Sequence, residues 1–240
     1  MDVLFLPDLR PTWDLEYDTA VVIDVLRATT TIVTALANGA LEVVPVASLE
    51  EAMEFGKRGY LVCGERGGLK PPEFDLGNSP LDYTRDRVEG RKICITTSNG
   101  TKAILCALNF SKRVFLGSFL NLSTLAERLK NVEKIIIICA GNEKTVSFED
   151  CLLAGAIVSK LVGADVSSNG PNESGKFFLS DSAMIVKYLW ESVRFPNFHG
   201  VHAKKLRELG FSEDVEFAKS VDLYSVVPEF DGNKIVPTNR

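Results

Sequence analysis

Short apolar runs alternate with helix-period patterns along most of the chain. Runs rich in Val, Ile and Leu predict strands at 3–6, 20–24, 42–47, 60–64, 92–97, 113–117 and 134–140. Patterns with a period near that of the α-helix predict helices near 28–38, 48–57, 80–87, 101–108, 121–131 and 147–162. Continuous runs such as "KIIIICA" are typical of strands that are covered on both faces. The alternation therefore predicts an α/β fold, with a largely parallel or mixed sheet between helix layers.

The end of the chain follows a different pattern. Helix patterns return at 179–193, 201–210 and 212–220, and "YSVVPEFDGNKIVP" predicts a hairpin that turns at Asp231-Gly232. Between the two parts, "DVSSNGPNESG" (165–175) has the composition of a linker. We expect one α/β domain over residues 1–240 with a C-terminal helix and hairpin elaboration. A division into two lobes near 165–175 is the alternative.

Composition and charge exclude several classes of protein. A net charge of −5 and the lack of a Lys/Arg cluster argue against a nucleic-acid partner. No apolar run approaches the ~20 residues needed to cross a bilayer, and the start "MDVLFLPDLRP" lacks the features of a secretory signal. The five cysteines form no C-x-x-C pair, which indicates buried thiols rather than disulfides or zinc ligands. We expect a cytoplasmic protein with no membrane partner, and the apolar helix 183–190 with Trp190 favours a homo-oligomer.

Polar residues follow several of the expected strands. In an open parallel sheet, ligands bind beyond the carboxyl ends of the strands. In "VVIDVLRATTT", Asp24 and Arg27 precede Thr29 and Thr30, and an arginine grips an anion with two donors. In "ICITTSNGTKAI", the strand runs into Ser98, Asn99, Gly100 and Thr101. A glycine, free helix N–H groups and hydroxyls together favour an anion site, although simple helix capping explains each loop taken alone.

Acidic residues at the same expected edge of the sheet indicate a cation. Asp24 follows three apolar residues, so its carboxylate must be paired or bound. Glu65 follows "YLVCG", and Glu149 and Asp150 begin a long helix. Such hard oxygen ligands suit Mg²⁺, while acids in a first helical turn also favour the helix dipole without any metal. The residues alone therefore predict a phosphate-type anion with a divalent metal.

Familiar phosphoryl-transfer and cofactor motifs are missing from the sequence. There is no G-x-x-x-x-G-K-[ST] loop, no D-x-D at Asp24, no C-x₅-R at Cys139 and no G-x-G-x-x-G. The two histidines stand in "FHGVH", where Phe198 precedes His199 and removes the R-H-G signature of histidine phosphatases. We expect His199 and His202 to lie in a loop, solvated or bonded locally.

Four blocks in order resemble one known family. "IDVLRATTTI", "CGERGGLKPPEFDLGNSP", "TTSNGTKAI" and "CAGN…SFEDCLLAGAI" span roughly residues 20 to 160 and are similar to the 2-phosphosulfolactate phosphatase (ComB) family. The resemblance implies a layered α/β/α fold. It also implies a Mg²⁺-dependent phosphatase that converts 2-phospho-3-sulfolactate to 3-sulfolactate and phosphate, a step of coenzyme M biosynthesis.

The resemblance also implies roles for single residues. Asp24 becomes a metal ligand or general acid/base, and Arg27 holds the phosphate or sulfonate of a small anionic substrate. The expected anion-binding set is Thr29, Thr30, Arg66, Ser98, Asn99, Gly100 and Thr101, and the expected metal ligands are Asp24, Glu65, Glu149 and Asp150. A phosphatase for another small 2-phosphohydroxy acid and a non-catalytic phosphometabolite-binding protein are the alternatives.

Overall fold

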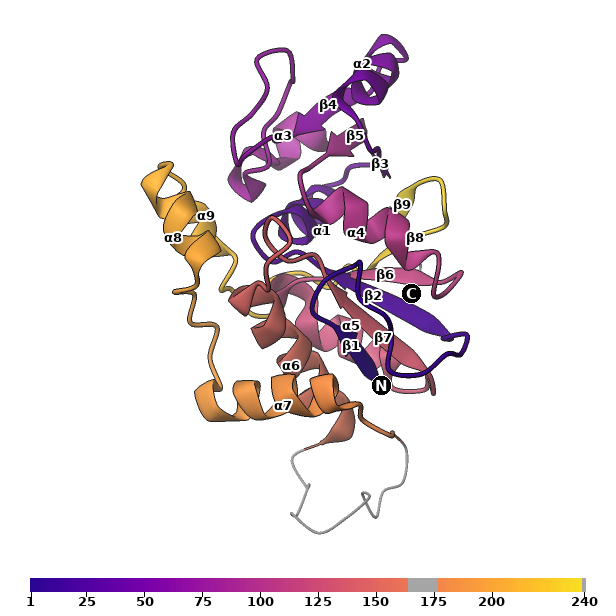
Figure 1. Ribbon diagram of the computed structural model, residues 1–240. Helices are drawn as coiled ribbons and strands as arrows, with labels where there is room; N and C mark the ends of the chain where they lie inside the picture. The colour runs from indigo at the N-terminus through magenta and orange to yellow at the C-terminus, as the bar shows by residue number, and fades with distance from the viewer. Residues whose placement is uncertain (164–176, 239–240) are drawn as a thin grey trace.

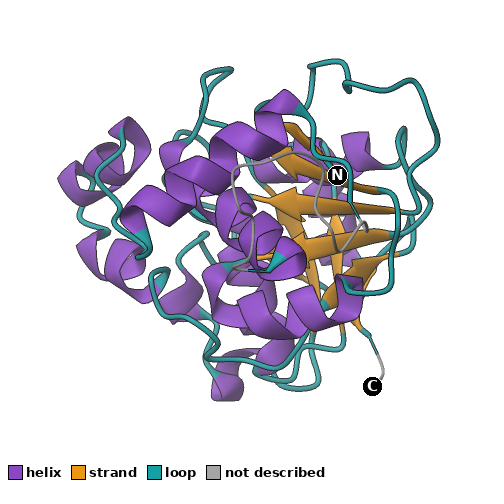
Figure 2. Cartoon of the chain, turned by 90° about the horizontal axis from the view of Figure 1, so that it is seen from below, coloured by secondary structure: helices purple, strands orange, loops and turns teal. Residues whose placement is uncertain are grey.

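The computed structural model describes residues 1–163 and 177–238 and contains a single nine-stranded sheet with helices on both sides (Figures 1 and 2). The expected linker at 165–175 lies outside the described residues. The strands are β1 (Asp2–Leu4), β2 (Thr19–Ile23), β3 (Glu42–Pro45), β4 (Leu61–Gly64), β5 (Lys92–Thr96), β6 (Val114–Gly117), β7 (Ile135–Cys139), β8 (Pro228–Phe230) and β9 (Ile235–Pro237). The helices are α1 (Ala28–Ala37), α2 (Leu49–Lys57), α3 (Arg85–Val88), α4 (Gly100–Ala107), α5 (Leu122–Leu129), α6 (Phe148–Val162), α7 (Asp181–Val193), α8 (Val201–Glu208) and α9 (Ser212–Phe217).

The expected helix at 80–87 is divided in two. A 3₁₀ turn at Pro80–Asp82 precedes α3, because Tyr83 leaves the helical conformation with φ −94° and ψ 53°. Its ring is buried, and its hydroxyl donates to the carbonyl of Gly77 at 2.7 Å. A buried tyrosine needs such a partner for its hydroxyl, so its packing takes precedence over the helix pattern.

The sheet contains two groups of parallel strands. β1, β7, β2 and β6 are parallel neighbours, and so are β3, β5 and β4. The antiparallel hairpin of β8 and β9 stands between the two groups, pairing with β6 on one side and β3 on the other. The expected α/β class with a mixed sheet is confirmed. The C-terminal hairpin was expected as an elaboration, and it joins the two groups at the centre of the sheet.

Alternating residues of strand β2 pack into two hydrophobic cores on opposite faces of the sheet. In β2, Val21 and Ile23 pack with α5, α6 and α7, while Ala20 and Val22 pack with α1 and α4 on the opposite face. All four are fully buried, and burial of each larger aliphatic side chain stabilises the fold by about 1.5–3 kcal/mol. This two-sided burial explains the continuous apolar runs and confirms the layered α/β/α arrangement, with helices on either side of the strands in Figure 2.

The two parallel groups direct loops into one pocket. Three antiparallel pairings separate β6 from β3, yet the loops that follow β2, β4, β5 and β7 all line the same cavity. The site is therefore formed between two sets of strand ends, where the sequence suggested one edge of one sheet. Helix α8, at the left of Figure 1, closes the cavity from the C-terminal part of the chain. Among the described helices, none has the length and apolar character needed to cross a membrane.

Candidate active site

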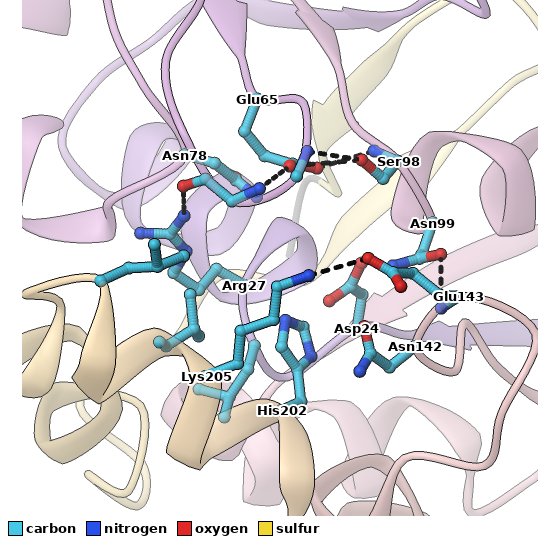
Figure 3. Close-up of a pocket in the computed structure, with 15 residues that line it drawn as sticks. Asp24, Arg27, Glu65, Asn78, Ser98, Asn99, Asn142, Glu143, His202 and Lys205 are labelled. Carbon is cyan, nitrogen blue, oxygen red and sulfur yellow. Dashed lines mark hydrogen bonds and ion pairs between the residues drawn. The ribbon is translucent and has the colours of Figure 1, made fainter.

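The pocket has walls of different character (Figure 3). Strand-end loops supply the first wall, and α8 supplies most of the second. The polar residues that line the first wall are Asp24, Arg27, Glu65, Asn78, Ser98, Asn99, Asn142 and Glu143. Helix α8 contributes His202, Lys205 and the apolar Leu206. Acids, amides and cations thus face one another across a small space.

Asp24 lies at the end of β2, against the starts of two helices. Its carboxylate accepts a bond from the Ala28 N–H at the start of α1. A Cβ atom at Gly100 would stand 2.5 Å from Asp24 Oδ2 and 2.4 Å from Ala28 Cβ, so a glycine is needed for α4 to begin here. Burial, followed by the nearby charge of Glu65, raises the pKa of Asp24 to about 7. The two carboxylates therefore repel each other and favour a cation between them.

The threonines of the first loop are used within the turn. The Thr29 hydroxyl donates to the Asp24 carbonyl at 2.8 Å and accepts from the Asp24 N–H at 3.0 Å. The Thr30 hydroxyl donates to the Val25 carbonyl at 2.8 Å. Both threonines are fully buried and lie outside the pocket lining. Their side chains fix the turn that presents Asp24, which removes the geometric support for direct anion binding.

The residues of the loop after β5 fall into two groups: some line the pocket or lie beside Asp24, and Thr101 is used within the loop. Ser98 and Asn99 line the pocket, and Gly100 brings the start of α4 next to Asp24. Thr101 instead exchanges hydrogen bonds with Thr97: its hydroxyl donates to the Thr97 carbonyl at 3.0 Å, and its N–H donates to the Thr97 hydroxyl at 3.1 Å. The Thr97 hydroxyl thus bonds an N–H of the first turn of α4, and the Thr101 hydroxyl is used within the loop rather than in the pocket.

Arg27 is inside the site but already paired. Its Nη1 donates to Asp214 Oδ2 at 2.6 Å, and its Nη2 donates to the Gly68 carbonyl at 2.7 Å. The guanidinium lies 4.2 Å from the ring centroid of Phe211, and Asp214 also accepts a bond from Ser79 at 2.6 Å. The ion pair is buried on both sides. Arg27 thus fastens the β2–α1 turn to α9, and its role as an anion ligand stays a prediction.

Glu65 organises the loop after β4. Its carboxylate accepts from the Ser98 N–H at 2.7 Å and the Gly68 N–H at 2.6 Å, which ties this loop to the one after β5. The neighbouring Arg66 points elsewhere, because its guanidinium donates to the Thr96 hydroxyl at 2.8 Å and to the Glu65 carbonyl at 2.7 Å. Glu65 lines the pocket and Arg66 does not. The structure therefore gives no geometric support to the expected second anion at Arg66.

Glu149 and Asp150 lie behind the pocket. Asp150 accepts from the Val25 N–H at 2.9 Å and from the Gly141 N–H at 3.1 Å, so it joins the turn after β2 to the loop after β7. Glu149 is directed toward the C-terminal part, where it accepts from the Gly200 N–H at 3.0 Å. Both are fully buried and neither lines the pocket. The expectation that these two acids join Asp24 around one cation gains no geometric support, because neither lines the pocket. Backbone N–H groups bond both oxygens of Asp150 but only Oε1 of Glu149, whose Oε2 has no partner among the described residues.

The pocket still has donors that suit Mg²⁺. In the part of the chain that the structure describes, no three His, Cys, Asp or Glu side chains form a ready-made metal site. Mg²⁺ needs fewer, since it is commonly held by one or two carboxylates, several waters and a substrate phosphate. Asp24 and Glu65 are such carboxylates, and the Oδ1 atom of Asn78 is buried without a hydrogen-bond partner among the described residues. These oxygen donors fit the ion.

Five polar residues of the pocket were not among the predicted site residues, and the first of them is Asn78, in the loop after β4. Asn142 and Glu143 follow β7, and the strand-end rule that identified the other loops also indicates them. His202 and Lys205 come from α8. The expectation that His202 lies in a solvated loop was wrong: it is the second residue of a helix. Burial, followed by the charge of Arg27, lowers its pKa to about 4.

Layered α/β architecture, a carboxylate pair at strand ends and a facing cationic helix are the features of an enzyme for small phosphorylated anions. Comparison with known proteins gives the family. A family model described as "2-phosphosulpholactate phosphatase" matches residues 4–233, and the chain belongs to this family. It is a phosphatase, a hydrolase that acts on a phosphate monoester.

Several curated proteins are similar over nearly their whole length. A "Probable 2-phosphosulfolactate phosphatase" of Thermotoga maritima is 46% identical over 92% of both chains. Proteins with the same name are 42% identical in Pseudothermotoga lettingae, over 98% of both chains, and 40% identical in Caldanaerobacter subterraneus, over 95% of this chain and 93% of the relative. This family membership excludes the alternative of a non-catalytic binding protein.

Proposed function

We propose that the protein is a Mg²⁺-dependent phosphatase that hydrolyses 2-phospho-3-sulfolactate to 3-sulfolactate and phosphate. One observation carries the proposal: Asp24 and Glu65 face Lys205 and His202 across a single pocket. Such a pocket offers oxygen ligands to a cation on one side and positive charge to an anion on the other. The names of the relatives indicate the substrate.

In the proposed reaction, water attacks phosphorus in line, the bond from phosphorus to the C2 oxygen breaks, and a proton moves to that oxygen. Mg²⁺ bound by Asp24 and Glu65 would neutralise phosphate charge. The starts of α1 and α4 add N–H dipoles beside Asp24. With its pKa lowered to about 4, His202 is neutral at pH 7 and offers one ring nitrogen as a proton acceptor.

Phosphate release tests the proposal directly. Purified protein is incubated with 2-phosphosulfolactate in Mg²⁺ or in a chelator, beside 2-phospholactate and phosphoglycolate. We expect release from 2-phosphosulfolactate that stops in chelator and returns with Mg²⁺. No release with Mg²⁺ present would overturn the substrate assignment, and release from another ester of the panel would favour a different 2-phosphohydroxy acid. Undiminished release in chelator would overturn the metal dependence.

The cellular setting belongs to the same proposal. We place the enzyme in the cytoplasm, in coenzyme M biosynthesis, and the support is the resemblance of its motif blocks to the family. Deletion of the gene is expected to make 2-phosphosulfolactate accumulate in the cell. Normal levels of this metabolite in the deletion strain would argue against the pathway.

Self-association is also proposed, with α7 as the contact. Ile185 and Tyr188 are 58% and 61% exposed on this helix. Trp190, which the sequence suggested for the same purpose, packs with Phe119 at 5.8 Å between ring centroids and lies partly buried against the core. Light scattering of the wild type and of Ile185→Glu tests the contact. A monomeric wild type would contradict it.

A further inference from the structure

Helix α8 is held rigidly over the pocket. Its start is fixed by the bond from the Gly200 N–H to Glu149, and its buried Leu206 belongs to the main core. Leu206 and Leu209 also contact the loop after β4, because a Cβ atom at Gly68 would stand 3.0 Å from Leu209 and 3.9 Å from Leu206. A side chain on this helix therefore occupies a defined place relative to the opposite wall.

The cations near the pocket differ in how firmly they are engaged. Arg27 is 3% exposed, and its guanidinium contacts Asp214, the Gly68 carbonyl and a phenylalanine ring. Arg66 donates away from the pocket. Lys205 lines the pocket and bonds Glu143 at 2.8 Å, with side chains 39% and 66% exposed. An exposed pair of this kind contributes about 0–1 kcal/mol, so an incoming anion displaces it easily.

Glu143 occupies a position that an anionic ligand can take. Its backbone N–H donates to Asn99 Oδ1 at 3.2 Å, while its carboxylate reaches across to Lys205 on the other wall (Figure 3). A carboxylate of the protein thus already engages the ammonium group from within the pocket. The carboxylate pair of Asp24 and Glu65 lies on the strand-end wall, where the phosphate with its metal is proposed to bind.

From these contacts we infer that Lys205 binds the sulfonate of the substrate, one of its two non-transferred anionic groups beside the carboxylate, and that the sulfonate displaces Glu143. The inference rests on the proposed function. With the phosphate held on the strand-end wall, a substrate that spans the pocket can present its sulfonate to Lys205 on α8. Lys205 then distinguishes a sulfonated phosphate ester from one that carries a methyl group at the same position.

The Lys205→Met variant tests this selection. It shortens the side chain by one atom and removes the charge, and Lys204→Met makes the same change at an exposed neighbour on the same helix. A charge-assisted hydrogen bond contributes enough to change binding about tenfold or more. We expect Lys205→Met to raise KM for 2-phosphosulfolactate at least about tenfold, with kcat and the KM for 2-phospholactate changed less than about twofold. Lys204→Met is expected to match the wild type on both substrates.

Two kinetic outcomes would overturn the inference. Equal loss on both esters would mean that Lys205 acts on the phosphate, on the carboxylate that both esters share, or on the fold, and no loss would mean that it contacts none of the substrate's anionic groups. Calorimetry gives a second readout that needs no turnover: wild type and Lys205→Met are titrated with 3-sulfolactate and with lactate. We expect Lys205→Met to weaken 3-sulfolactate alone. Failure of the wild type to bind 3-sulfolactate more tightly than lactate would overturn the inference even if phosphate release succeeds, and the preference would support it even if release fails.

Discussion

Residues 1–163 and residues 177–238 contribute to the pocket in different ways. The first region carries the recognisable blocks, and its strand-end loops hold Asp24 and Glu65. The second region carries no block that the sequence analysis assigned to the site, yet it supplies a wall of the pocket and two strands of the sheet. The difference suggests that motifs identify the groups proposed to hold the reacting phosphate, whereas the groups that face them across the pocket come from segments brought there only by folding.

The largest effect is expected at the centre of the first region. Asp24→Asn removes a carboxylate from the pocket, and we expect phosphate release to fall at least about a thousandfold. Folding should not suffer: burial raises the pKa of Asp24 to about 7, so above that pH the native state carries a costly buried charge that asparagine lacks. Phosphate assays and thermal unfolding at pH 8 measure both quantities.

The exposed Asp86, at the start of α3, offers the control. Asp86→Asn should retain wild-type activity. Activity of Asp24→Asn within tenfold of the wild type would remove Asp24 from the mechanism. It would also contradict the view that residues 1–163 supply the groups that act on the phosphate.

The link between the two regions is the next target. Asp214→Ala leaves the guanidinium of Arg27 buried without its partner. Because both side chains are at most 3% exposed, we expect the free energy of unfolding to fall by about 3 kcal/mol. Urea unfolding measures the change. Glu213→Ala alters an exposed acid in the same helix turn and should change it little; a similar loss in both variants would mean that the ion pair does not join the regions.

A smaller effect is expected where β3 meets the hairpin turn. Glu42 accepts from the Tyr60 hydroxyl at 2.7 Å and from the Lys234 ammonium at 2.9 Å, and these bonds lower its pKa to about 2. A depressed pKa stabilises the fold above the unfolded value of about 4.3 and loses this effect as pH falls toward 2. Since Lys234 is partly exposed, Glu42→Gln should cost about 1 kcal/mol at pH 7.

Urea unfolding of Glu42→Gln at pH 7 and near pH 2 checks the sign. The difference from the wild type should shrink at the lower pH. A difference that stays constant with pH would assign the effect to packing rather than to charge.

The smallest effect is expected at Glu149, beneath α8, as a change in how steeply the free energy of unfolding varies with pH. Burial raises the pKa of this carboxyl, so its contribution to stability is present below its unfolded pKa and is lost as pH rises through the folded value. Glu149→Gln keeps an oxygen acceptor for the Gly200 N–H and does not ionise. Its unfolding free energy should therefore fall less steeply than that of the wild type as pH rises from 5 to 9. Parallel curves would show that Glu149 is already ionised in the native protein.

Strand-end loops were predictable because parallel α/β sheets gather ligands there, and this rule led to Asp24, Glu65, Ser98 and Asn99. The rule predicts where these side chains lie, but not which groups they form hydrogen bonds with. Thr29, for example, has a residue type that suits anion binding and turn formation equally, and only the hydrogen bonds show that the turn uses it. The same applies to the acids at the start of α6, where backbone N–H groups bond Asp150 and one oxygen of Glu149.

The contribution of the second region could not be read from local pattern. The helix at 201–210 and the turn at Asp231-Gly232 were both predicted, and both exist. Their places depend on contacts between residues far apart in sequence, such as Arg27 with Asp214 or Phe115 with Glu229. Periodicity specifies which face of an element is apolar, and it does not specify which distant surface that face covers.

The central position of the β8–β9 hairpin has a consequence for biosynthesis. The two strands that join the halves of the sheet are synthesised after all the other strands that the structure describes, so neither half has its inner neighbour until they emerge. Until then the β6 and β3 edges remain unpaired, and unpaired edges promote aggregation of nascent chains. Completion of the sheet thus depends on synthesis of residues 228–237, and we expect shortened products that end before residue 228 to depend on chaperones or to be degraded.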